Sequence, residues 1–491
     1  MEAVLAVPAV VGQGAFHFPG ISIDGAVPRG VHRELHRRLM RREAWQAMDD
    51  ARFGFADVSA MPAETDVVIH FGPETPALQR TCRSTYGAWL LCDVMGRAIA
   101  DMFPGIAAWA EGARTLTLTL KQLEVEGTRI RMERTYPLPA DHVGDALSDV
   151  LMHAADLPAH LCLQLLQGAL PEVRTIAPSA SARPALFGPI LALLKERIPL
   201  LDRPQRRYPL TWNIGTAEHS IVRCLSGAPY NVRWLPPPGE GASRTNPAGY
   251  LHEDRLNVLY AKEGSDGRKV IARVRPKADQ LLKRSRTMLS GEQDHEHPFT
   301  LVIGGETFAV LGAPGNKGVV LYRITPGNDA LEPAAFLCDT PLFHAILFTH
   351  ADRWWLMGTV APFPDATLEV FHAEQPEGPY RRHARSPVKV DIRSAKPAGT
   401  PFVHEGALYR PAQDLSAPER PQVVMLRITE LTADRFEEEP VFVVPPVAGS
   451  IWDHATSTLH AVGDILLVGG ARRPPGVPAP VRRTHRSFDD E

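Results

Sequence analysis

Three carboxylates stand at points in the sequence where general acid–base chemistry would be possible if the fold brought them together. Glu296 precedes His297, whose protonation state would raise or lower the pKa of the neighbouring carboxyl. Asp339 precedes a Thr-Pro pair and could act as a general base or could cap the amides of a strand. Asp414 follows a glutamine, and such pairs also hold turns. We therefore predict Glu296, Asp339 and Asp414 as the acid–base groups, with a structural role left open for the two aspartates.

A second group of residues has the side-chain types that bind a sugar or another polar small molecule. Trp212 could stack on a sugar ring, although tryptophans also pack inside cores. Lys396 could hold a phosphate or carboxylate, or pair with Asp391. The candidates for substrate binding are Trp212, Asn213, Asn246, His297, Lys396, Arg410, Gln413 and His454.

A metal ion is an alternative for part of this set. Imidazole and carboxylate ligands suit zinc or iron, so His297, Asp339 and His454 could hold such an ion. Their spacing in the sequence does not require one, and histidines also serve as simple hydrogen-bond partners. The sequence therefore demands no cofactor.

Composition excludes several classes of partner. The 491 residues carry 53 Lys plus Arg and 56 Asp plus Glu, a net charge of −3, which gives no support for nucleic acid or an anionic membrane as the main partner. Five scattered cysteines, none at zinc-ligand spacing, predict reduced thiols in a cytoplasmic protein. We expect neither a signal peptide nor a membrane span, and nothing in the sequence indicates an oligomeric state.

A repeat in the second half predicts the fold. Five copies open at Thr245, Glu296, Cys338, Ala395 and Ile451, and each joins an apolar strand to an aromatic-rich one through a turn. Four prolines, at 247, 298, 341 and 397, mark steps of 51, 43 and 56 residues. Periods of this size with about four strands each predict the blades of a five-bladed β-propeller over residues 208–470. The residues that open the copies should then converge on the central channel and place the site at its mouth.

The first part of the chain has a different pattern. Residues 30–48 and 144–170 have apolar residues at helical intervals, whereas 65–72 and 115–120 are typical of strands. We predict an α/β domain over residues 1–171, a Pro- and Ala-rich connector over 172–207, and a disordered tail over 471–491.

Several motifs in the repeat carry a family resemblance. They are Trp212-Asn-Ile-Gly215, the Asp339-Thr340 pair, Glu369-Val-Phe-His-Ala373 with Gly378-Pro-Tyr380, Lys396-Pro-Ala-Gly399, Leu408-Tyr-Arg-Pro-Ala-Gln-Asp414 and His454-Ala-Thr456. Together they resemble the propeller domain of the glucosamine inositolphosphorylceramide transferase type, which is distantly similar to family 43 glycoside hydrolases. The resemblance covers about 260 residues and implies a five-bladed propeller acting on glycans.

The resemblance also implies a site pattern from which this chain departs. The similar hydrolases use an axial Asp as base, a second Asp and a Glu as acid. Here Asn246 stands at the first Asp, and Leu311-Gly-Ala-Pro314 lacks the Glu that usually follows the Pro. Relatives often carry an N-terminal domain that resembles methionyl-tRNA formyltransferase. Asp66-Val-Val-Ile69 and Tyr86-Gly-Ala-Trp89 agree with it, but the catalytic Asn and His motifs are missing, and Glu126 stands nearest the expected Asp.

Three functions remain as hypotheses. The leading one is an enzyme of glycan or specialised-metabolite biosynthesis, with glycosyl-transfer or hydrolysis-like chemistry on a sugar at the channel mouth. The alternative is a non-catalytic carbohydrate-binding or scaffold protein in which both ancestral sites are lost. A further alternative is formyl or acyl transfer by the N-terminal domain.

Overall fold

The computed structural model describes part of the chain. The described residues are 17–19, 54–56, 67–70, 86–94, 96, 113–124, 127–138, 156–166, 210–228, 230–239, 241–264, 267–276, 285–312, 318–325 and 330–472. They fall into two compact units, one of residues 1–204 with 365–367 and 387–395, and the other of the remaining residues.

The first unit contains a small mixed sheet and one described helix. A four-stranded sheet has the order β3 (Val68–His70), β4 (Ala88–Asp93), β5 (Thr115–Glu124) and β6 (Gly127–Pro137). β3 and β4 are parallel, and the other pairs are antiparallel. The helix α7 spans Asp156–Leu166, and β1 (His17–Pro19) pairs with β2 (Gly54–Ala56).

Alternation explains the long strand of this unit. In β5, Leu116, Leu118 and Leu120 are buried on one face, as the Thr-Leu repeat predicts. The strands predicted near 65–72 and 115–120 are found, and α7, Asp156–Leu166, lies within the range of the helix predicted over 144–170. The helix predicted over 30–48 lies outside the described residues, and the formyltransferase-like α/β fold stays a prediction.

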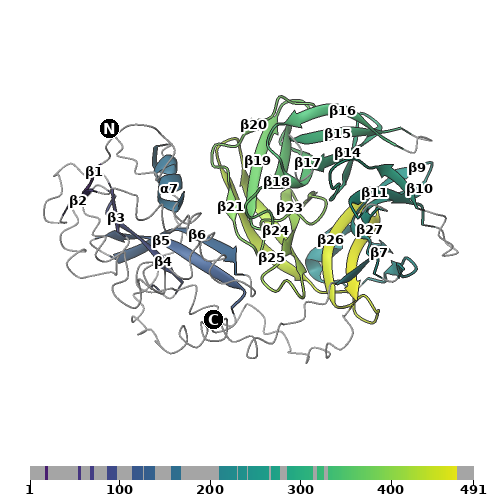
Figure 1. Cartoon of the computed structure of the whole chain (residues 1–491), viewed down its shortest axis with the longest axis horizontal. Helices are drawn as coiled ribbons and strands as arrows, with labels where there is room; N and C mark the ends of the chain where they lie inside the picture. The colour runs from purple at the N-terminus through teal and green to yellow at the C-terminus, as the bar shows by residue number, and fades with distance from the viewer. Residues whose placement is uncertain are drawn as a thin grey trace. The chain divides into compact units, whose positions relative to one another are not determined.

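The second unit consists of blades, each a sheet with a run of four strands (Figure 1). The first blade is β9 (Thr245–His252), β10 (Arg255–Glu263), β11 (Lys269–Val274) and β12 (Arg286–Leu289). The second is β13 (Phe299–Ile303), β14 (Glu306–Gly312), β15 (Val319–Ile324) and β16 (Leu331–Cys338). The third is β17 (Phe343–His350), β18 (Arg353–Thr359), β19 (Thr367–Ala373) and β20 (Arg381–Arg382), with β21 (Lys389–Val390) also on β19.

The fourth and fifth blades complete the ring. The fourth is β22 (Phe402–His404), β23 (Ala407–Asp414), β24 (Gln422–Leu431) and β25 (Phe436–Val444). The fifth joins β26 (Ala455–Val462) and β27 (Ile465–Arg472) to β7 (Thr211–Glu218) and β8 (Arg233–Trp234), which come from the start of the unit. In Figure 1 the yellow β26 and β27 lie beside the teal β7. The described blades therefore form the predicted five-bladed propeller, and β27 extends two residues into the predicted tail.

Two-residue hairpins set the register of all five blades. They connect the innermost strand to the next one at Glu253-Asp254, Gly304-Gly305, Ala351-Asp352, Glu405-Gly406 and Gly463-Asp464. In the first four, both turn residues have positive φ, the conformation of a type I′ turn. Counting back from the hairpins aligns Asn246, His297 and His344. Pro341, which the sequence repeat uses as a marker, lies four residues too early, so that marker was wrong.

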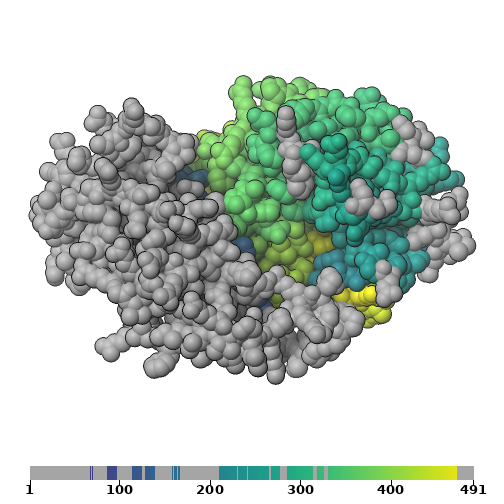
Figure 2. Space-filling view, viewed as in Figure 1, coloured from purple at the N-terminus to yellow at the C-terminus, as the bar shows by residue number. Residues whose placement is uncertain are grey.

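Apolar side chains fill the spaces between neighbouring blades. Tyr250 and Leu259 of the first blade pack with Ala309 and Tyr322 of the second in one buried cluster. Figure 2 shows the outer surface of this unit, where the described residues run in colour from teal to green. No helix among the described residues is long and apolar enough to cross a membrane.

Candidate functional site

The inner strands of the first three blades begin with the same unusual backbone conformation. Asn246, His297 and His344 have φ of 53°, 55° and 53°, in the left-handed region that residues other than glycine rarely adopt. In the first and third blades the pairing also shifts register at this point. Left-handed residues of this kind cluster at functional sites because the surrounding structure must hold them. The equivalence of the three positions marks this end of the inner strands as the candidate site.

Two histidines lie against each other at this end. The ring centroids of His297 and His344 are 3.7 Å apart, and the ring planes make an angle of 74°. Nδ1 of His297 lies 3.6 Å from Oε2 of Glu296, and Lys269 from β11 forms an ion pair with Oε1 of the same carboxylate. Glu296 and His297 each keep about a fifth of the side chain exposed, so solutes can reach them.

Burial keeps both imidazoles neutral. The pKa of His297 is well below its usual value, first because of burial and then because of the positive charges of Lys396 and Lys269. Burial also lowers the pKa of His344, and His297 and Lys396 add to the effect. A neutral imidazole keeps a nitrogen lone pair that can accept a hydrogen bond or a proton, although the lowered pKa makes each ring a weaker base than a free imidazole.

Thr359 is the described hydrogen-bond partner of Nδ1 of His344. Its hydroxyl lies 2.9 Å from Nδ1 and 3.4 Å from the carbonyl oxygen of Phe343. When the hydroxyl donates its one hydrogen to that carbonyl, it accepts the Nδ1–H of His344, and Nε2 of His344 then carries a lone pair that can receive a proton or a hydrogen bond.

No described contact joins Glu296 to Asp339 or Asp414. Asp339 is exposed directly after β16, the outermost strand of the second blade, and it is His344, five residues on, that reaches the cluster. Asp414 ends β23, and its Oδ1 accepts a hydrogen bond of 2.8 Å from the amide of Ser416. Asp414 thus holds a turn, the structural role that the sequence also allows. Of the predicted acid–base groups, only Glu296 lies in the cluster.

Two predicted binding residues have buried side chains that bond to partners inside the fold. Asn213 is fully buried: its side-chain amide donates to the carbonyl of Leu235 at 2.7 Å, and its oxygen accepts from Arg244 at 2.8 Å. Arg410 is fully buried in a two-point ion pair with Glu438, at 2.6 and 2.7 Å. Both side chains therefore serve the interior of the fold, where buried polar groups need internal partners.

Of the other predicted binding residues, three lie at or act on the histidine cluster and three make contacts elsewhere. His297 and Asn246 lie at the aligned positions, and the charge of Lys396 acts on both histidines. Gln413 is buried, and its backbone amide donates to the carbonyl of Lys396 at 2.8 Å. His454 is buried, and its Nε2 lies 2.8 Å from the carbonyl of Glu419. Trp212 is half-buried in β7, where its backbone amide donates to Ser243.

No described group of three or more His, Cys, Asp and Glu side chains has a geometry that could hold a metal ion. His297, Asp339 and His454 are all described, so the structure does not support the alternative in which they share an ion. Metal sites outside that set stay a matter for experiment.

Sequence reasoning missed His344, Thr359 and Lys269. The first could have been found by counting eight residues back from the second turn residue of each hairpin, Asp254, Gly305 or Asp352, in place of using prolines. Thr359 pairs with Phe343 across β17 and β18, which only the strand register reveals.

A buried network of hydrogen bonds around His460 lies in the middle of the inner strands. His460 of the fifth blade is 2% exposed and lies 3.0 Å from the hydroxyls of both Thr300 and Thr400. Thr300 donates to the carbonyl of Gly249 at 2.6 Å, so Nε2 of His460 must donate to Thr300 and Nδ1 must accept from Thr400. One ring thereby connects the first, second, fourth and fifth blades. Its pKa falls to about 4 because of burial.

Fold and site together define the second unit as a five-bladed β-propeller with a polar cluster where its inner strands begin. Residues 246–448 match the family described as glucosamine inositolphosphorylceramide transferase 1, N-terminal. The chain is 31% identical over 153 residues to a protein of that name from Oryza sativa subsp. japonica, and 23% identical over 150 residues to one from Arabidopsis thaliana. These matches cover 30% and 29% of this chain and 20% of each relative, so the chain spans about a fifth of the curated relatives it matches.

Solved structures with a similar chain course are glycoside hydrolases. The catalytic domain of the GH62 α-L-arabinofuranosidase of Coprinopsis cinerea has a TM-score of 0.38 and 11% identity, over 48% of this chain and 86% of that one. A family 117 glycoside hydrolase from Zobellia galactanivorans has a TM-score of 0.34 and 12% identity, over 56% and 96%. The fold assignment itself rests on the strand order and register of the described blades. The resemblance predicted from the Leu408–Asp414 motif is confirmed as a similarity over residues 246–448.

Proposed function

We propose that this chain is a glycan-related enzyme that binds a sugar-bearing substrate where the inner strands of its propeller begin. The observation that carries the proposal is the pair of neutral imidazoles, His297 and His344, beside the partly exposed carboxylate of Glu296. Imidazole and carboxylate groups accept hydrogen bonds from sugar hydroxyls, and Asn246 adds an amide at the equivalent position of the first blade.

The chemistry that suits this cluster is transfer to a hydroxyl. Hydrolysis by two carboxyl groups would require a second carboxyl about 5–10 Å from the first. No described contact places Asp339 or Asp414 beside Glu296, and Asn246 cannot act as the base. Nε2 of His344 can instead take the proton of a substrate hydroxyl as that oxygen bonds to the anomeric carbon of a nucleotide-sugar donor, while the bond from that carbon to the nucleoside diphosphate breaks and the diphosphate leaves as an anion that needs no acid. The name of the relatives, glucosamine inositolphosphorylceramide transferase 1, supports a proposal of this reaction class.

A second candidate is a non-catalytic carbohydrate-binding module. It is favoured by the single carboxylate, which is already paired with Lys269, and by the relatives' name for the matched region, which is N-terminal. Both candidates use the same cluster, so one experiment can separate them.

The experiment is a search for chemical change in a bound sugar. The full chain is applied to a glycan array that includes glucosamine- and inositol-phosphate-bearing compounds, and each bound compound is then incubated with nucleotide-sugar donors. Mass spectrometry should find a product of higher mass with the unaltered chain and at least about 100-fold less with His344→Gln. Bound but unchanged glycans would favour the binding module. Equal product with His344→Gln would remove the base from its proposed role.

A further inference from the structure

The far end of the propeller, where the inner strands turn back, carries a ring of mostly apolar side chains that reach the surface. The hairpin register places Leu251, Val302, Thr349, Val403 and Ala461 at one level, one from each blade. Leu251, Val302 and Val403 are 43%, 64% and 56% exposed. This level lies about 17 Å along the strands from the His297–His344 cluster, at some 3.3 Å per residue. We call these five side chains the apolar ring.

The exposure is particular to this level. Two residues earlier on the same strands, Gly249, Leu347 and Leu459 are buried. Four of the five inner strands are therefore buried two residues before this level, and their apolar side chains become exposed near the turn. Burial of apolar surface is favourable by about 25 cal/mol of free energy for each Å² removed from water, so this exposed surface favours contact with another surface.

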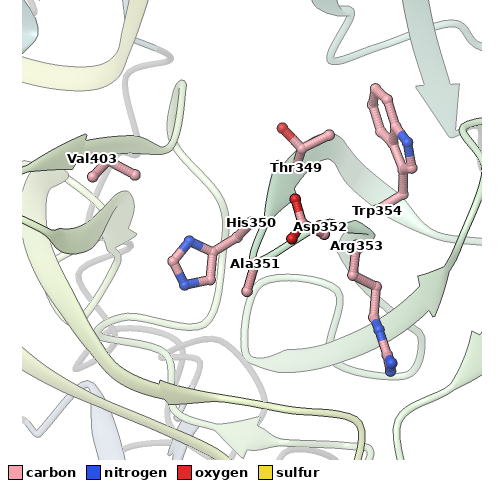
Figure 3. A pocket seen from close by; sticks show the side chains of 7 residues that line it. All are labelled: Thr349, His350, Ala351, Asp352, Arg353, Trp354 and Val403. Atoms are coloured by element: carbon pink, nitrogen blue, oxygen red, sulfur yellow. The ribbon is translucent and has the colours of Figure 1, made fainter.

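A hollow lies beside the ring between the third and fourth blades. It has a volume of about 560 Å³ and is lined by Thr349, His350, Ala351, Asp352, Arg353, Trp354 and Val403. In Figure 3 the imidazole of His350 lies between the β17–β18 turn and Val403. A side chain of an incoming partner could enter the hollow while its neighbours cover the ring.

The acidic side chains of the hairpins around the apolar ring indicate the charge of a partner. The ten hairpin residues include the acidic Glu253, Asp254, Asp352, Glu405 and Asp464, all exposed, and no Lys or Arg. Arg255 and Arg353 flank two of the turns, and Glu306 flanks a third but is paired with Arg323, so the five turn carboxylates still outnumber the neighbouring arginines. An anionic membrane would be repelled by such a rim, and so would the same face of a second copy.

We infer that this face, the apolar ring with its acidic turns, docks a basic segment of a partner protein that presents apolar side chains. Its Arg or Lys residues would lie against the turn carboxylates while a Leu-, Val- or Phe-type side chain enters the hollow. Complementary charge speeds the encounter, and apolar burial holds the complex. The inference is independent of the catalytic proposal, because the cluster lies at the other end of the strands.

The test is selection of peptides from a random phage-displayed library against the full chain, followed by calorimetric titration of the enriched peptides. Peptides that combine Lys or Arg with aliphatic or aromatic residues should be enriched. Their binding should weaken about tenfold or more in the double variant Val302→Thr, Val403→Thr. Glu253→Gln with Glu405→Gln should also weaken it, and should reduce its dependence on salt.

The matched control is Val441→Thr with Val443→Thr, two valines of β25 with exposures of 43% and 42%, which should leave binding unchanged. The inference would be overturned if no peptide were enriched, if the enriched peptides were acidic or neutral, or if Val302→Thr with Val403→Thr bound them as tightly as the control variant does. Co-sedimentation of the chain with phosphatidylserine vesicles, lost in the ring variant, would overturn it in favour of a membrane.

Discussion

At the scale of single residues, threonine hydroxyls direct the tautomers of two histidines, one in the candidate site and one in the interior of the propeller. Thr359 accepts from Nδ1 of His344, whereas Thr300 accepts from Nε2 of His460. The first choice leaves a lone pair for a substrate proton, and the second completes a buried hydrogen-bond chain. The sequence could predict that histidines gather at the axis, but not which nitrogen each one offers, since the threonines come from other strands.

Thr359→Val should therefore release the tautomer of His344. Without the acceptor hydroxyl, Nδ1 loses its partner, and both neutral tautomers become populated. Nitrogen chemical shifts of the labelled imidazole should move from a single Nδ1–H form toward a mixture, while Thr359→Ser keeps the original form. An unchanged spectrum in Thr359→Val would show that the hydroxyl does not direct the ring.

Burial of His460 predicts a pH dependence of stability. Its folded pKa of about 4 lies below the value of 6.5 expected in the unfolded chain, so the unfolded state binds the proton more readily between the two. The stability held by the neutral ring is complete above pH 6.5 and is lost as the pH falls toward 4, by about 3 kcal/mol in total.

Denaturant unfolding at pH 4.5 and 7 would measure this loss. His460→Gln, which can bond both threonines but cannot titrate, should show a clearly smaller difference between the two pH values. Equal differences in the two proteins would assign the pH dependence to other groups.

At the scale of elements, the hairpins place the site. The sequence repeat reveals five blades, because apolar strands and turns recur at blade-like intervals. It fails to align them, because Pro247 and Pro298 each lie six residues before the first turn residue of their hairpin, whereas Pro341 and Pro397 lie ten and eight residues before theirs. That error favoured Asp339 in place of His344. The turn residues carry the better signal, although Ala351 in a left-handed position hides one of them.

The same hairpins offer a matched pair of substitutions. Ala351 has φ 49°, so Ala351→Gly should stabilise the fold by up to about 1 kcal/mol by relieving the left-handed strain. Gly463 has φ 58° and open space around a would-be Cβ, so Gly463→Ala should destabilise it by about 1 kcal/mol through the backbone alone. Thermal unfolding would measure both, and changes of the same sign would contradict the left-handed conformation of these two turn residues.

At the scale of the whole molecule, the propeller is closed by a strand from the start of the second unit. β7 pairs with β27 along its full length, from Ile465 opposite Glu218 to Arg472 opposite Thr211. The first strand after the predicted connector thus completes the last blade. The sequence placed Trp212-Asn-Ile-Gly215 ahead of the first blade, because order along the chain does not reveal which edge a strand will join.

Closure can be tested by trimming the chain. A fragment of residues 205–472 keeps β7 and β8 and should unfold in one cooperative transition. A fragment of residues 242–472 leaves the edge of β27 unpaired, so it should aggregate or unfold at much lower temperature. Equal melting of the two fragments would contradict a role for β7 in closure.

The central claim is that a sugar binds where the inner strands begin, against Glu296 and the histidine pair. The most direct measurement is calorimetric titration of the glycan that binds best on the array to the unaltered chain, Glu296→Gln and Asp339→Asn. We predict that Glu296→Gln weakens binding about tenfold or more, because it removes a charged acceptor, and that the exposed Asp339→Asn binds like the unaltered chain. Binding that survives Glu296→Gln but fails in Asp339→Asn, or no binding of any glycan to the unaltered chain, would contradict it.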